Sequence, residues 1–241
     1  MEETLEFLEA VKRGDVERVS AIVEADPKRV RVAGEQGKTG LHWAAELDRI
    51  EVARVLVDAG ADIEARTSWG ASPLEWASTM GGSRVAELLL ERGARGLTLI
   101  VAAGLGKYSE VEAIIESGAD LATHARSAAP RAPNDHWPAD SAHILGDTVS
   151  DALYAAARNG QTQVVEYLAE HGAKVDAKGV FGATGLHWAA INGHTGTVEL
   201  LISLGANLEL KDERFDATAE EWAKEGGHHE IADILRRRGA S

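Results

Sequence analysis

The chain repeats itself, and this internal repetition constrains its fold more than any other feature. Two stretches are nearly identical, GKTGLHWAAE at residues 37–46 and GATGLHWAAI at residues 182–191. A third stretch, GASPLEWAST at residues 70–79, keeps the same frame, and each of the three is followed by a second apolar run that ends in glycine. Such self-similarity at a regular period is typical of proteins built from stacked, similar structural units.

A block of 17 residues, counted from the alanine that follows the tryptophan, describes seven copies of this unit. Successive blocks start 34, 33, 25, 54, 33 and 34 residues apart, so one connection is short and the next is long. The blocks are residues 10–26, 44–60, 77–93, 102–118, 156–172, 189–205 and 223–239.

Each copy predicts two short helices. The first is rich in alanine, which lets a neighbour approach closely, and the second places apolar residues three and four apart, as at Val52, Val55 and Leu56. The closing glycine suits the left-handed backbone conformation just past a helix end. Because one helix pair cannot bury its apolar face alone, the copies must stack, and we expect an all-α solenoid.

The opening Thr-x-Leu-His-x-Ala-Ala, the ending Gly-Ala-Asp and the spacing near 33 resemble ankyrin repeats. The resemblance implies that Thr39 bonds to His42 and Thr184 to His187, as structural pairs within and between repeats. It also implies a concave face, formed by the first helices and hairpin-like fingers, that binds another protein. The chain departs from the family pattern where Ile100 and Tyr154 stand in place of the histidine.

We expect one ankyrin-repeat domain over residues 1–241, with repeats 1 to 4 in residues 1–121 and repeats 5 to 7 in residues 150–241. Residues 122–149 form an inserted loop that contains three of the five prolines together with Trp137. The short connection before the fourth repeat leaves almost no room for a finger. We therefore hypothesise that the inserted loop folds over this gap.

The inserted loop also brings together side chains with acid, base or metal-binding chemistry. The catalytic candidates are Asp135, His136, Asp140, His143 and, just after the loop, Tyr154. Their spacing matches no metal-binding or catalytic motif, and capping or solvated roles are the simpler interpretation. The sequence predicts no metal and no cofactor.

Tryptophans recur at one place in four repeats, and half-burial against the next repeat would explain them. They are Trp43, Trp76, Trp188 and Trp222. Smaller residues, Val101 and Ala155, take this place in two middle repeats, so the groove should be wider there. A pocket floored by these two residues, flanked by Trp76 and Trp188 and roofed by Trp137, would suit a small molecule. Its nearest polar groups would be Glu75, Tyr154 and His187.

Composition limits the partners. The chain has 25 Lys plus Arg against 39 Asp plus Glu, and this net charge of −14 would repel nucleic acid and an anionic membrane surface. It has no cysteine, no apolar run long enough for a membrane span and no secretory signal, so we expect a cytoplasmic, acidic protein. We also expect a monomer.

These features favour a protein-binding module or scaffold over an enzyme, with a basic protein as the partner. The alternatives are an enzyme or small-molecule binder whose pocket lies under the insert, and a purely structural component of an assembly. A solenoid fold does not choose among these functions. The expected binding residues are Trp43, Trp76, Glu75, Trp137, Trp188 and Tyr154.

Overall fold

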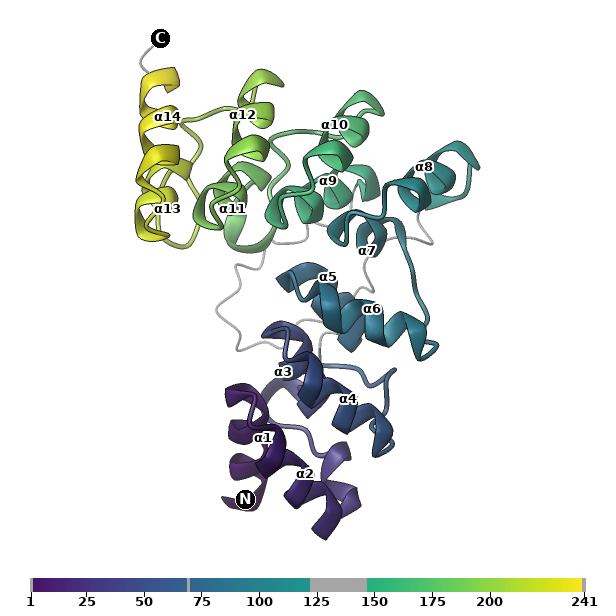
Figure 1. Ribbon diagram of the computed structural model, residues 1–241. Helices are drawn as coiled ribbons and strands as arrows, with labels where there is room; N and C mark the ends of the chain where they lie inside the picture. Colours follow the sequence, from purple (N-terminus) through teal and green to yellow (C-terminus); the bar gives the residue numbers. More distant parts are fainter. Residues whose placement is uncertain (1, 69, 122–146, 240–241) are drawn as a thin grey trace. The chain divides into compact units, whose positions relative to one another are not determined.

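The computed structural model describes residues 2–68, 70–121 and 147–239, and the described residues are mostly helical. The helices pair in sequence order and group into two compact units, one up to Gly96 and one from Leu97 onward. Each unit consists of two layers, a layer of first helices and a layer of second helices (Figure 1). The predicted all-α repeat fold is confirmed, whereas a single continuous domain over residues 1–241 stays a prediction.

The described residues of the first unit form three helix pairs and two 3-10 helices. Helices α1, α3 and α5 pack side by side as first helices, and α2, α4 and α6 form the second layer. Their bounds are α1 Glu2–Arg13, α2 Val16–Ala25, η1 Pro27–Arg31, η2 Glu35–Gly37, α3 Gly40–Glu46, α4 Ile50–Asp58, α5 Pro73–Met80 and α6 Ser83–Glu91.

The second unit, as far as the structure describes it, contains four helix pairs in the same arrangement. Helices α7, α9, α11 and α13 are the first helices, and α8, α10, α12 and α14 are the second helices. Their bounds are α7 Leu99–Gly104, α8 Tyr108–Glu116, α9 Thr148–Arg158, α10 Thr162–Glu170, η5 Val180–Gly182, α11 Gly185–Ile191, α12 Thr195–Ser203, α13 Ala219–Glu225 and α14 His229–Gly239.

One backbone hydrogen bond marks the start of all seven predicted blocks. In each block the amide five residues after the first alanine donates to the carbonyl of that alanine, at 2.8 to 3.0 Å. This bond closes the tight turn between the two helices of a pair. The donor and acceptor pairs are Asp15 and Ala10, Arg49 and Ala44, Gly82 and Ala77, Lys107 and Ala102, Gln161 and Ala156, His194 and Ala189, and His228 and Ala223.

The closing glycines have the left-handed conformation that the sequence predicts, with two exceptions. In five blocks the closing glycine has a positive φ, a backbone conformation that is unfavourable for a residue with a side chain. These glycines are Gly60, Gly93, Gly118, Gly172 and Gly205. The exceptions lie at the chain's first and last blocks, where Asp26 is extended and Gly239 is the last residue of α14.

Small residues let the first helices pack closely. In the second unit Ala102 on α7 and Ala156 on α9 are completely buried, and one apolar cluster runs from Leu99 to Leu235. Burial of this continuous apolar surface is the main stabilising contribution in a stack of repeats. No helix within the described ranges is both long enough and apolar enough to cross a membrane.

The short connection predicted before the fourth repeat has a structural counterpart. Helix α7 has 6 residues, one fewer than α3 or α11, and begins after Thr98, whose hydroxyl accepts a hydrogen bond from the amide of Val101 at 3.3 Å. On the far side of the long connection, α9 begins at Thr148. The last two residues of the segment 122–149, which we expected to be inserted, are therefore helical.

Candidate protein-binding surface

A Thr-His pair caps the first helix and connects it to the next finger, the loop that leads into the following first helix. Nδ1 of His42 accepts hydrogen bonds from the Thr39 hydroxyl at 2.9 Å and the Thr39 amide at 3.2 Å. Nε2 of His42 donates to the carbonyl of Ala71 in the next finger at 3.0 Å, which fixes the tautomer. Thr184 and His187 form the same pair and reach Ala217 at 3.2 Å. Both pairs confirm the predicted structural role.

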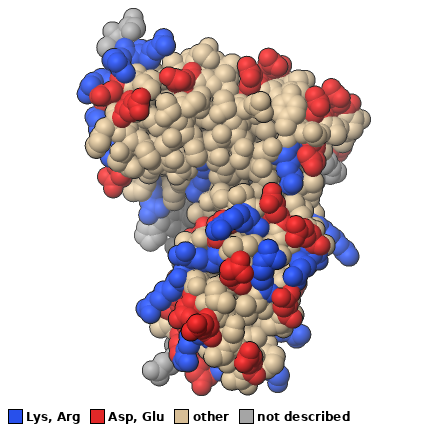
Figure 2. Space-filling model, in the orientation of Figure 1, with Lys and Arg blue, Asp and Glu red and all other residues tan. Residues whose placement is uncertain are grey.

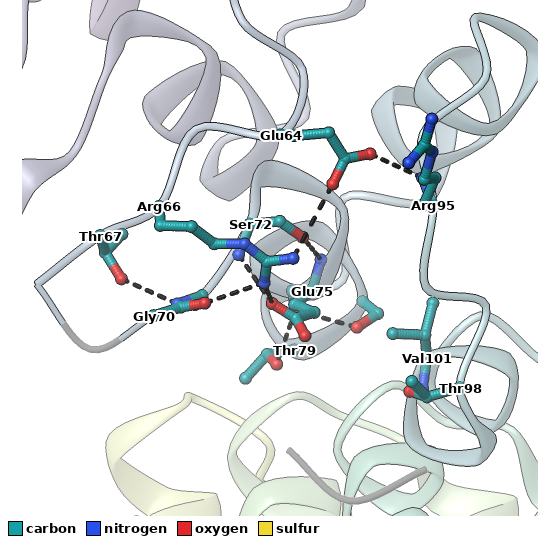
Figure 3. A network of polar contacts seen from close by, with 12 residues as sticks. Glu64, Arg66, Thr67, Gly70, Ser72, Glu75, Thr79, Arg95, Thr98 and Val101 are labelled. Atoms are coloured by element: carbon teal, nitrogen blue, oxygen red, sulfur yellow. Dashed lines mark hydrogen bonds and ion pairs between the residues drawn. The ribbon is translucent and has the colours of Figure 1, made fainter. Parts of the chain in front are cut away.

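Glu75, which we expected to bind a partner, takes the place of this histidine in the third repeat. Its carboxylate accepts the amide of Ser72 and a guanidinium nitrogen of Arg66, both at 2.7 Å, and the Ser72 hydroxyl accepts the amide of Glu75 (Figure 3). The backbone carbonyl of Glu75 accepts a further bond from Thr79. The side chain of Glu75 is only 22% exposed, and its contacts are those of a capping residue.

The tryptophans of the first unit are joined by a buried lysine. The Lys38 ammonium lies 4.2 Å from the Trp43 ring centroid and 4.4 Å from the Trp76 ring centroid, both within the range of cation–π attraction. It also pairs with Glu46 at 2.8 Å, and Glu46 accepts a hydrogen bond from the Trp76 indole at 2.8 Å. This network covers a face of each indole and satisfies the indole N–H of Trp76, so the tryptophans of this unit mainly support its structure.

The second unit places two phenylalanines on its fingers. Phe181 and Gly182 have consecutive positive φ angles of 65° and 68°, as in the tight turn of a hairpin. The Gly179 amide donates to the Ala183 carbonyl across this turn, and the Glu213 amide in the next finger donates to the Phe181 carbonyl at 2.7 Å. Phe215, in that next finger, is 61% exposed.

Four aromatic rings form a closed cycle between these two fingers and the helices beneath them, and we call it the aromatic cycle. Each ring contacts the next with centroid separations of 5.0 to 6.3 Å, which is the favourable range for aromatic pairs. The cycle runs from Phe181 to Trp188, Trp222 and Phe215. It joins a buried base, where Trp222 is 5% exposed, to the exposed ring of Phe215.

Two arginines lie against the aromatic cycle. The guanidinium of Arg158 on α9 lies 3.6 Å from the Trp188 centroid, and that of Arg214 lies 4.5 Å from Phe181 and 5.1 Å from Phe215. Planar guanidinium groups stack on aromatic rings. Arg158 is only 9% exposed, so the guanidinium at the surface is that of Arg214. The surface therefore combines apolar rings with positive charge.

Asp212 holds the finger that carries Phe215. Its carboxylate accepts the amides of Arg214, Phe215 and Ala217 at 2.7 to 3.1 Å and the Trp222 indole at 2.9 Å. Burial alone would raise the pKa of Asp212, but these hydrogen bonds outweigh it and the pKa is lowered. The ionised carboxylate thus fixes the finger on the base of the aromatic cycle.

The remaining sequence candidates belong to the aromatic cycle, are buried, or lie outside the described residues. Trp188 belongs to the aromatic cycle. Tyr154 is only 3% exposed, and its ring packs so closely on Gly179 that a Cβ there would collide with it. Val101 and Ala155, the expected pocket floor, are each 1% exposed. The last group lies outside the described residues: Asp135, His136, Trp137, Asp140 and His143.

The expected pocket is not tested by these placements. Trp76 belongs to the first unit and Trp188 to the second, and Trp137 is not described. Within residues 2–68, 70–121 and 147–239, no group of three or more His, Asp or Glu side chains is arranged to hold a metal ion.

Sequence reasoning missed the exposed half of the candidate surface, namely Phe181, Phe215 and Arg214. The sequence does contain a signal for Phe181. The pairs Phe181-Gly182 and Gln36-Gly37 occupy equivalent turn positions, directly before Ala-Thr-Gly at 183–185 and Lys-Thr-Gly at 38–40. A large aromatic residue at such a turn packs on little of its own repeat and so faces a neighbour or a partner.

Comparison with known proteins identifies the family. A family model described as ankyrin repeats (3 copies) matches residues 7–99, 99–212 and 153–241. The chain therefore belongs to the ankyrin-repeat family.

Individual relatives and a solved structure show how far the likeness extends. The chain is 23% identical over 185 residues to a putative ankyrin repeat protein of Rickettsia bellii, covering 75% of this chain and 24% of that protein. It is 32% identical over 88 residues to mouse protein phosphatase 1 regulatory subunit 27, covering 36% of this chain and 57% of that protein. The human ASB11 ankyrin repeat domain is similar with a TM-score of 0.45 and 23% identity, covering 96% of both chains. The chain thus spans about a quarter of the length of the Rickettsia relative and 57% of the length of the mouse relative.

Proposed function

We propose that the chain binds a partner protein through the fingers and first helices of its second unit, with the aromatic cycle and Arg214 as the anchoring contacts. The observation that carries this proposal is the 61% exposure of Phe215 beside Phe181, above a rigid and buried base. Aromatic and arginine side chains dominate the energetics of protein interfaces. A repeat stack that is already ordered loses little entropy on binding.

The family membership supports a protein-binding role in general terms, because repeat stacks present extended binding surfaces. The mouse relative is named as a regulatory subunit of protein phosphatase 1, that is, as a component of an assembly with another protein. For this chain we propose a partner that packs apolar side chains against the exposed ring of Phe215, where the two fingers meet. The net charge of −14 favours a partner with an excess of positive charge, through long-range attraction.

The test compares two exposed apolar residues of similar accessibility. Tagged wild-type chain, Phe215→Ala and Leu5→Ala are used to capture proteins from lysate, and mass spectrometry quantifies the captured proteins. Leu5 is 62% exposed but lies on α1 in the first unit, so it is a matched control. A partner captured by the wild type and by Leu5→Ala, but lost with Phe215→Ala, supports the proposal.

The affinity of that partner is then measured with purified proteins. We expect Phe215→Ala to weaken binding about thirtyfold, as an interface anchor that contributes about 2 kcal/mol would. Its melting temperature should stay close to that of the wild type, because the ring is largely solvent-exposed. Equal capture by all three chains would contradict the proposed surface.

A further inference from the structure

A second candidate surface lies in the layer of second helices, away from the residues of the aromatic cycle. A hollow of about 430 Å³ is bounded by α8 and α10. Its lining consists of Tyr108 from α8 and Gln163, Glu166, Tyr167 and Glu170 from α10. Neither the predicted sites nor the proposed finger surface includes these residues.

The walls of the hollow are aromatic. Tyr108 and Tyr167 meet edge to face with centroids 5.3 Å apart, and the His171 ring stacks on Tyr167 at 4.0 Å. Tyr108 is 37% exposed, whereas Tyr167 is only 8% exposed. The negative face of an aromatic ring attracts a cation.

The hydroxyl group of Tyr167 is buried and has no hydrogen-bond partner among the described residues. A buried polar group without a partner costs about 1 to 3 kcal/mol, so its retention calls for an explanation. Because Tyr167 lines the hollow, a ligand with a hydrogen-bond donor would supply the missing partner.

The two charged side chains that line the hollow, Glu166 and Glu170, are both acidic. Neither α8 nor α10 contains Lys or Arg, and acidic side chains gather along the edge of the second unit where these helices lie (Figure 2). Four carboxylates act on Tyr108 and, after the larger effect of desolvation, raise its pKa. Within the described chain none of the four forms an ion pair. They are Glu112, Glu116, Glu166 and Glu170.

We propose that this hollow binds an arginine side chain from a basic segment of a partner protein. The guanidinium plane would lie against Tyr108, its several N–H groups would donate to Glu166 and Glu170, and one would reach the Tyr167 hydroxyl. Arginine suits this lining better than lysine, because it combines a flat stacking surface with five donors in a fixed geometry. Binding would also relieve the mutual repulsion of the glutamates.

The proposal is tested with the full chain and two fluorescent peptides, measured by anisotropy at low ionic strength. One peptide carries arginines between glycine and serine residues, and the other carries lysines at the same positions. We expect the arginine peptide to bind at least several-fold more tightly than the lysine peptide. Equal binding of the two peptides, or no binding, would overturn the assignment.

Three variants locate the site. Glu166→Gln combined with Glu170→Gln should weaken binding of the arginine peptide roughly three- to tenfold, a typical range for partly exposed ion pairs. Glu199→Gln, an exposed glutamate on α12, is the matched control and should leave binding unchanged. Tyr167→Phe keeps the ring and removes only the hydroxyl, so it should weaken binding several-fold without lowering the melting temperature.

The peptide experiments can fail or succeed independently of the test of the finger surface. An equal loss with Glu199→Gln would show general attraction to the acidic chain and would refute the hollow as the site. Unchanged binding with Tyr167→Phe would refute the role of the buried hydroxyl. Phe215→Ala should not affect the arginine peptide, so failure of either proposal leaves the other standing.

Discussion

At the scale of single residues, the residue at one position of the first helix, histidine or glutamate, decides which hydrogen bonds cap that helix. Repeats with histidine use Nδ1 to accept from the preceding threonine and Nε2 to reach the next finger, as His42 does. Repeats with glutamate close the cap with a carboxylate, as Glu75 and Glu221 do with Ser72 and Thr218. Glutamate has no counterpart of Nε2, and each of these two glutamates lies in the last described helix pair of its unit.

The buried histidine makes stability depend on pH. Burial lowers the pKa of His42 from 6.5 to about 4, with smaller contributions from the charges of Lys38 and Arg66 opposed by the hydrogen bond to Ala71. The folded state therefore binds fewer protons than the unfolded state between these values, and the free energy of unfolding must fall as pH drops from about 6.5 to about 4. The pKa values of His187 and His194 are lowered too, mainly by burial, and act in the same direction.

We predict that His42→Gln has a weaker pH dependence than the wild type. Between pH 7 and pH 5 the wild type should lose about 2 kcal/mol of unfolding free energy through His42 alone, a loss that the variant avoids. Urea unfolding at the two pH values measures the difference. Identical losses in the two proteins would show that His42 is protonated in the folded state as readily as in the unfolded state.

At the scale of elements, two equivalent fingers contain unfavourable backbone geometry. Gln36 in the first unit and Phe181 in the second unit both have positive φ, at 59° and 65°, although neither is glycine. The left-handed conformation costs a residue with a side chain about 1 to 2 kcal/mol, and asparagine tolerates it best among them. An aromatic residue that is kept at such a position points to a role beyond the turn itself.

We predict that Phe181→Asn separates stability from binding. Asparagine relieves backbone strain but removes the ring contacts to Trp188 and Phe215, so unfolding free energy should change by less than about 1 kcal/mol. Affinity for the partner that depends on Phe215 should fall. The matched control is Gln36→Asn, which makes the same change at the equivalent turn and should leave affinity intact. If Phe181→Asn binds as the wild type does, the ring belongs to the fold alone.

At the scale of the whole molecule, the acidic charge and the exposed aromatic surface act in opposite directions on self-association. The net charge of −14 repels a second copy, and the exposed Phe215 ring is a small area of apolar surface. We predict that the chain sediments at the mass of a single chain at micromolar concentrations. A concentration-dependent shift to twice that mass in analytical ultracentrifugation would contradict this and would give the aromatic cycle a second copy as its partner.

The repeat register was predictable from the sequence because it depends on contacts between residues close along the chain. The alanine that starts each block accepts a hydrogen bond from an amide five residues later, and the closing glycine responds to the helix directly before it. The pairs of Thr39 with His42 and Thr184 with His187 are equally local. A repeated local signal needs no knowledge of distant neighbours.

Tertiary structure alone decided which side chains remain available to a partner. Trp43, Trp76 and Trp188 share one sequence position, yet Lys38 occupies the indoles of the first two, whereas Ala183 at the equivalent place leaves Trp188 to pack with Phe181. The hollow between α8 and α10 likewise joins residues more than 50 positions apart in the sequence. Exposure and charge pairing depend on which neighbours a side chain meets across the stack, and periodicity along the chain does not contain that information.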